Sequence, residues 1–113
     1  MSVQPGTYNI TLQRRADYSL LLQFKDSTDS AINLTGYTAY AQVWNEGRTT
    51  KYADFGIAYT DRSNGQVTIS LTDTQTTDFI DELRYDVLLE DGSGNREYYL
   101  EGVIFVSEGY TAP

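Results

Sequence analysis

Residues 85–106 read YDVLLEDGSGNREYYLEGVIFV, two runs of alternating apolar and polar side chains on either side of a turn. In the first run Tyr85, Val87 and Leu89 share one face, because successive side chains of a strand point to opposite sides. The turn at residues 91–95 contains two glycines, which readily adopt the positive φ angles of tight hairpins. The stretch therefore predicts a β-hairpin with one apolar and one polar face.

The same two-residue rhythm recurs along the rest of the chain. Residues 72–83 break it and predict a short helical turn, capped by Thr74, that bridges two sheets. Residues 1–6 and 108–113 are predicted tails of a single domain, which 113 residues suit. The further strands are predicted over residues 8–12, 18–24, 32–34, 37–44, 55–59 and 67–71. This pattern predicts an all-β fold, an immunoglobulin-like β-sandwich of 7–8 antiparallel strands.

Two residues of the decisive stretch carry local predictions. Tyr85 follows the crossover and opens a late strand, where a tyrosine corner would pin a sandwich by bonding backbone upstream. The alternative is an ordinary core tyrosine, and both interpretations are structural. Gly102 interrupts the last strand and indicates either a bulge or a close approach of another backbone segment.

The composition excludes several chemistries. The chain has no cysteine and no histidine, so disulfides, thiol nucleophiles, His-based triads and Cys/His zinc sites are absent. Carboxylates are plentiful, but a sandwich of this size has little surplus chain to build a catalytic cleft around them. Residues 91–95 superficially resemble an acidic calcium loop, although a hairpin turn explains them equally well. We therefore expect no enzyme, no cofactor and no bound metal.

The charge is large and unevenly placed. The net charge is −8, and residues 57–113 carry all of it, since residues 1–56 hold five basic and five acidic side chains. This balance argues against nucleic acid, and the pair Arg14-Arg15 is too short to form a binding patch. An acidic face would favour a basic partner, and the alternative is a solubilising surface. No apolar stretch approaches the roughly 20 residues of a membrane span, so no membrane partner is expected.

Tyrosine is the unusual feature of the composition. Ten residues are Tyr, four are Phe and one is Trp, more than a small core can hide. Exposed Tyr and Trp offer large contact area at low entropic cost and concentrate in binding hot spots. The alternation places Tyr40, Trp44, Tyr52 and Tyr99 outside, and these are the predicted interface residues. The alternative is a ladder of cross-strand aromatic pairs on a solvated face.

Several runs of the chain also resemble a known family. They are DYSL (17–20), QFKD (23–26), INLTGY (32–37), AQV (41–43), NGQVTISL (64–71), residues 72–77, YDVLL (85–89) and LEGVIFV (100–106). Over residues 8–106 the order of elements resembles β-sandwich domains of tailed-bacteriophage virion proteins, most of all the N-terminal domain of the upper baseplate protein family. Members of that family usually anchor a receptor-binding or fibre module to the virion; because residues 1–113 hold only the sandwich, we expect an adaptor or decorating subunit here instead of direct host binding.

The resemblance and the aromatic excess together predict a non-enzymatic structural protein of a phage virion, made in the host cytoplasm. It would act as a baseplate, tail or fibre adaptor, docking on other virion proteins through tyrosine-rich sheet faces and forming homo-oligomers in the particle. Capsid decoration is an alternative within the same class. A carbohydrate-binding adhesion module is the alternative from a different class.

Overall fold

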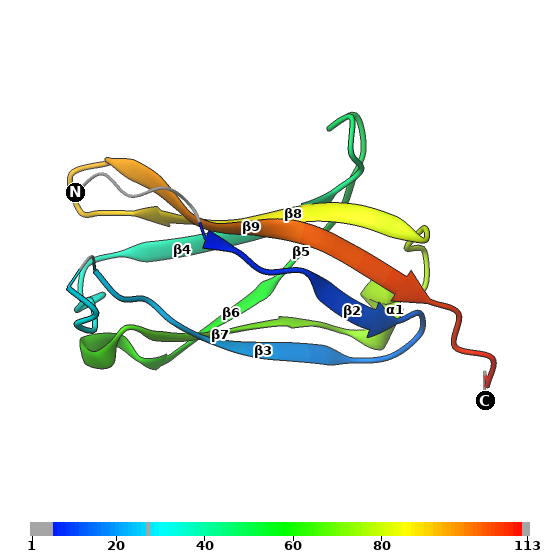
Figure 1. Cartoon of the computed structure of the whole chain (residues 1–113), viewed down its shortest axis with the longest axis horizontal. Coiled ribbons are helices and arrows are strands. Elements are labelled where there is room, and N and C mark those ends of the chain that lie inside the picture. The colour runs from blue at the N-terminus through cyan, green and yellow to red at the C-terminus, as the bar shows by residue number, and fades with distance from the viewer. Residues whose placement is uncertain (1–5, 27, 112–113) are drawn as a thin grey trace.

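The computed structural model describes residues 6–26 and 28–111, which form two β-sheets packed face to face (Figure 1). The strands are β1 (Gly6–Thr7), β2 (Ile10–Gln13), β3 (Tyr18–Gln23), β4 (Thr38–Trp44), β5 (Lys51–Asp54), β6 (Gly56–Asp61), β7 (Gln66–Leu71), β8 (Glu82–Glu90) and β9 (Arg96–Ser107). The helical turns are η1 (Arg62–Asn64) and α1 (Asp73–Thr76). No helix in this part of the chain is long and apolar enough to cross a membrane.

The strand order is that of an immunoglobulin-like sandwich. One sheet runs β1-β9-β8-β4-β5, with β2 pairing further along β9, and the other runs β3-β7-β6. In immunoglobulin lettering, β9-β8-β4-β5 corresponds to strands G-F-C-C′ and β3-β7-β6 to strands B-E-D. The predicted β8–β9 hairpin and the crossover at α1 are confirmed. The cap of α1 is Thr72 instead of Thr74, because Thr72 and Gln75 form a reciprocal capping box.

The N-terminal edge departs from the predicted all-antiparallel pairing. β1 and β2 run parallel to β9 in one continuous register, from Gly6 opposite Leu100 to Gln13 opposite Ser107. They are two pieces of one edge strand, interrupted at Tyr8 and Asn9, which brings the described strands to nine. Hydrophobic alternation identifies a strand but not its partner's direction, so the sequence could not reveal this parallel edge.

The core lies between the sheets, and both contribute to it. Val43 and Val87 from the larger sheet and Val67 from the smaller one are wholly inaccessible to solvent. Fully burying a side chain of this kind stabilises the fold by roughly 1.5–3 kcal/mol. Loop residues close the ends of the core: Phe24, Leu34, Phe55 and Phe79 are all buried. Packing of the core thereby holds the outward side chains of the larger sheet in fixed positions.

A buried clip joins the interrupted edge strand to the middle of the larger sheet. Tyr85 points inward, and its hydroxyl donates a 2.5 Å hydrogen bond to the Tyr8 carbonyl, 77 residues away. The Tyr85 hydroxyl thus bonds to backbone upstream, as predicted, but its partner lies on the N-terminal edge and not a few residues before Tyr85, as in a tyrosine corner. Gly102 lies opposite Tyr85, and a Cβ there would be 2.0 Å from the Tyr8 oxygen. Of the two interpretations of Gly102, close backbone approach is the correct one.

The segment after β9 is held to the body of the domain, although it was predicted as a tail. Arg14 donates to the Phe79 carbonyl at 2.7 Å and pairs with Glu108. Arg15 pairs with Glu108 at 2.5 Å and also donates to the Gly109 carbonyl. Gly6 lies in β1, while residues 1–5 and 112–113 of the predicted tails lie outside the described residues.

Replacing Gly102 by Ala tests this clip. The added methyl overlaps the Tyr8 carbonyl, so Gly102→Ala should lower the free energy of unfolding by about 1–3 kcal/mol, as overpacking does. Gly6→Ala is the matched control on the same edge, because its Cβ would meet nothing closer than 3.7 Å. Urea denaturation measures both variants, and equal stability of the two would contradict the close approach.

Candidate functional site

The two sheets present very different outer faces. On the three-stranded sheet the outward side chains are mostly small and polar, and the Thr60 and Thr68 hydroxyls bond to each other at 2.7 Å. Leu21 is a large apolar side chain exposed on that sheet. On the six-stranded sheet, aromatic and charged side chains line the outward positions of β4, β8 and β9. Exposed aromatic area is typical of interfaces, so this second face is the candidate docking face.

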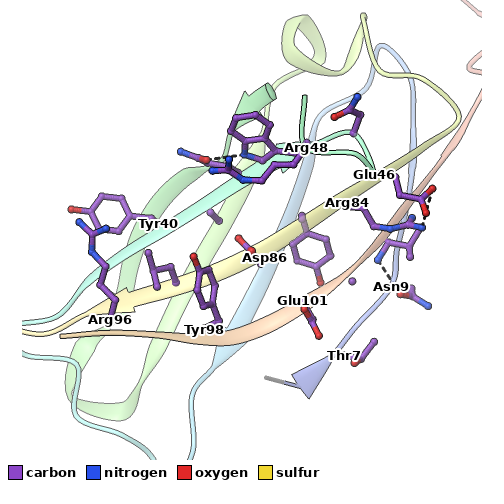
Figure 2. Close-up of a pocket in the computed structure, with 18 residues that line it drawn as sticks. Thr7, Asn9, Tyr40, Glu46, Arg48, Arg84, Asp86, Arg96, Tyr98 and Glu101 are labelled. Atoms are coloured by element: carbon purple, nitrogen blue, oxygen red, sulfur yellow. Dashed lines mark hydrogen bonds and ion pairs between the residues drawn. The ribbon is translucent and has the colours of Figure 1, made fainter. Parts of the chain in front are cut away.

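Cross-strand pairing arranges the docking face in three rows. Residues directly opposite each other in an antiparallel pair lie about 4.5–5.5 Å apart at Cβ, so each row is continuous. From β4 through β8 to β9, the rows are Tyr40–Leu88–Tyr98, Gln42–Asp86–Glu101 and Trp44–Arg84–Val103. They line a groove with a volume of about 710 Å³ (Figure 2).

The first row forms the aromatic wall of the groove. Tyr40 is 45% exposed and Tyr98 is 52% exposed, with Leu88 between them in the register. Figure 2 shows the two tyrosine rings at the same end of the groove, beside Arg96. The outward placement predicted for Tyr40 is confirmed. Tyr98 was not among the predicted interface residues, and the only signal for it was its place in a run of two tyrosines.

Trp44 lies on the same face as predicted, but its ring is less available than an exposed platform. The indole N–H donates to Gln42 Oε1 at 2.9 Å. The Arg48 guanidinium lies 4.4 Å from the ring centroid, within the range of a cation–π contact. The residue is half-buried. Trp44 therefore forms an oriented, partly covered wall at the other side of the groove.

The predicted exposure of Tyr52 and Tyr99 is wrong, and for both the physical reason is a β-bulge. The register of β8 and β9 shifts so that Tyr99 is an extra residue, and the register of β4 and β5 shifts so that Tyr52 is one. Each ring is half-buried and packs edge-on against a core phenylalanine. Tyr99 lies 5.2 Å from Phe24, and Tyr52 lies 6.2 Å from Phe79, between ring centroids.

The centre of the groove holds two carboxylates that face each other. Asp86 on β8 is directly opposite Glu101 on β9, and Figure 2 shows both between Tyr98 and Arg84. Partial burial raises the pKa of the Asp86 carboxyl above its usual range; Glu101 adds to this effect and Arg48 opposes it. Like charges directly opposite on a sheet destabilise it. The pair therefore costs the free protein stability.

The turn at residues 91–95 uses its acidic group internally. Asp91 accepts hydrogen bonds from the backbone N–H groups of Ser93 and Asn95 and from the Asn95 side chain, at 2.9–3.2 Å. These bonds hold the pKa of Asp91 below its usual range, with the bonds from Asn95 contributing most. Within residues 6–26 and 28–111, no group of three or more acidic side chains is placed to hold a metal ion.

The sequence and the structure were compared with known proteins, and only structural matches were found. No family model matches it, and no curated protein matches its sequence. Among solved structures it is similar to the Lin-41 filamin domain, with 15% identity and a TM-score of 0.48 over 88% of this chain and 84% of that one. It is also similar to the N-terminal Ig1-2 module of the Drosophila receptor protein tyrosine phosphatase DLAR, with 12% identity, a TM-score of 0.49 and 93% of this chain covered. The chain spans 47% of that module.

Truncation of the two neighbouring tyrosines of β9 should have very different effects on stability. Tyr99→Ala removes a ring packed on Phe24 and should cost about 1–3 kcal/mol of stability, less than a fully buried aromatic. Tyr98→Ala removes an exposed ring and should change stability by no more than about 0.5 kcal/mol. Thermal unfolding followed by circular dichroism measures both. A larger loss for Tyr98→Ala would refute the bulge.

Neutralising Asp86 should stabilise the protein. Because its pKa is raised on folding, the charged form disfavours the native state, and this cost appears as the pH rises above the unfolded carboxyl pKa of about 3.9. Asp86→Asn should therefore raise the melting temperature by a few degrees at pH 7, for a gain of about 0.2–1 kcal/mol. The gain should disappear at pH 3, where the carboxyl is protonated in both states.

Asp91→Asn is the control of opposite sign for that experiment. The pKa of Asp91 is lowered on folding, so its charged form stabilises the turn at neutral pH, and this contribution is lost in acid. Asp91→Asn should therefore lower the melting temperature at pH 7. A destabilised Asp86→Asn variant would show that the carboxylate pair is not a cost to the free protein.

Proposed function

We propose that the chain is a non-catalytic docking subunit that joins other proteins through the docking face of its six-stranded sheet. The observation that carries the proposal is the contrast between the two outer faces. Tyr40 and Tyr98 expose their rings on one sheet, while the outward side chains of the other are mostly small and polar, with Leu21 as the exposed large apolar residue. Aromatic side chains on a well-packed sheet lose little conformational entropy on binding, so such a face suits a protein partner.

A phage virion is the setting that we propose for this docking. The support is the resemblance of residues 8–106 to the sandwich domains of tailed-phage virion proteins, the upper baseplate family above all. The subunit would then lie in the particle as a baseplate, tail or fibre adaptor, with other virion proteins as its partners. Several copies would be present, as homo-oligomers. Capsid decoration is the variant of this role in which the partners are capsomers.

An adhesion module for host glycans is the second candidate, since aromatic rings and carboxylates line the same groove. One observation weighs against it. A sugar stacks on an uncovered face of an aromatic ring. The Arg48 guanidinium already covers the Trp44 ring. Saturable binding on a glycan array that is lost in Trp44→Ala would favour adhesion over docking.

Incorporation into particles tests the docking role. A tagged Tyr40→Ala/Tyr98→Ala double variant is expressed during infection by the phage that, on this proposal, encodes the chain. Its amount in purified particles should fall about tenfold or more, the effect of losing hot-spot aromatics. Circular dichroism should show an unchanged fold, since both rings are exposed. Leu21→Ala, an exposed apolar residue on the opposite sheet, is the matched control and should be incorporated normally. Equal incorporation of all three proteins would refute the proposal.

A further inference from the structure

The arginines around the groove already have partners of their own. Arg96 Nε lies 2.6 Å from a Glu90 carboxylate oxygen. Arg84 pairs with Glu82 at 3.2 Å and with Glu46 at 3.7 Å. These ion pairs lie at the surface and add little stability. They do mean that Arg84 and Arg96, at the rim of the groove, each have an acidic partner there. None of these cations is paired with the two carboxylates on the groove floor.

The carboxylates of Asp86 and Glu101 therefore have no ion-pair partner among the described residues. Neither side chain forms a hydrogen bond or an ion pair with another residue of the described ranges. The Arg48 cation acts on Asp86 electrostatically, while its guanidinium covers the Trp44 ring. Two adjacent negative charges, one of them on the partly buried Asp86, are unfavourable until a cation lies between them. The negative charge of this groove thus favours binding of a positively charged group from a partner.

The surroundings of the pair determine which cation fits. On β4 and β8 neighbouring rows are two residues apart, about 7 Å, so one flat group fits over the Asp86–Glu101 row beside the tyrosine row. A guanidinium presents several N–H donors in one plane and stacks on aromatic faces, which a compact ammonium does less well. A calcium ion needs six to eight oxygens, and the floor has two carboxylates and an amide already bonded to Trp44.

We propose that this groove receives an arginine side chain of the protein partner, with Asp86 and Glu101 as acceptors of its N–H groups and the Tyr40 and Tyr98 rings as its stacking surface. The inference rests on the proposed docking function and adds the chemistry of the partner. Asp86 and Glu101 both belong to residues 57–113, the half of the chain that carries the net negative charge.

The test uses the full chain and a blocked tripeptide, acetyl-Gly-Arg-Gly-amide, titrated by two-dimensional ¹H–¹⁵N NMR. The peptide should cause saturable shifts at the amides of residues 86, 98 and 101. The same peptide with citrulline, which keeps the shape and loses the charge, should not. In an Asp86→Asn/Glu101→Gln variant the affinity should fall about tenfold or more, as expected for lost charge-assisted bonds. This variant should fold, because it removes a like-charge pair.

Glu82→Gln is the control for the Asp86→Asn half of that variant, since it also removes one negative charge from the outer face of β8, away from the floor of the groove. It should keep the wild-type affinity, which separates a local site from a general effect of net charge. Equal shifts with citrulline, or wild-type affinity in the double variant, would overturn the proposal. So would shifts of these amides with calcium chloride but not with the arginine peptide.

Failure of this inference and failure of the proposed function have different signatures. If Tyr40→Ala/Tyr98→Ala is not incorporated into particles but the arginine peptide does not bind, the face docks through other chemistry and only the arginine inference is wrong. If that variant is incorporated normally, the docking role itself is wrong.

Discussion

The antiparallel pairing of β8 with β9 is the constraint on which both halves of this molecule depend. The inward side chains of the pair, such as Val87 and Ile104, are fully buried and build the core. Asp86 and Glu101, which point outward from the same two strands, form the floor of the groove. A shift of one residue in this register would exchange the two sets, because side chains alternate with a period of two. Core packing therefore also positions the docking face.

The bulges show how the fold departs locally from that alternation. Three register shifts occur in the described sheets, and each involves a tyrosine: Tyr52, Tyr99 and Tyr59. Two of the rings pack on core phenylalanines, and the Tyr59 hydroxyl accepts the Ala39 backbone N–H at 2.9 Å, where β4 extends beyond β5. A large side chain with one polar end can fill the gap left by a bulge and satisfy a backbone group there. Much of the tyrosine excess thus serves the fold, and the docking face uses only part of it.

The docking face is organised by charge as well as by shape. The rim arginines form ion pairs with rim acids, whereas Asp86 and Glu101 at the centre have no such partner among the described residues, at a cost to the free protein. Stability alone would favour a neutral residue at Asp86. A site whose side chains oppose the stability of the free protein is the pattern expected when binding has been selected over folding.

By itself, the sequence determined the class of fold, the hairpin at 91–95, the crossover at α1 and the outward placement of Tyr40 and Trp44, because all of these follow from local alternation and turn chemistry. The tertiary structure alone decided the parallel edge of β1 and β2, the bond from Tyr85 to Tyr8 and the inward rotation of Tyr52 and Tyr99. It also decided that Asp86 and Glu101 meet. Each of these features joins residues distant in sequence or depends on a one-residue shift in register, and a periodic pattern carries no information about either.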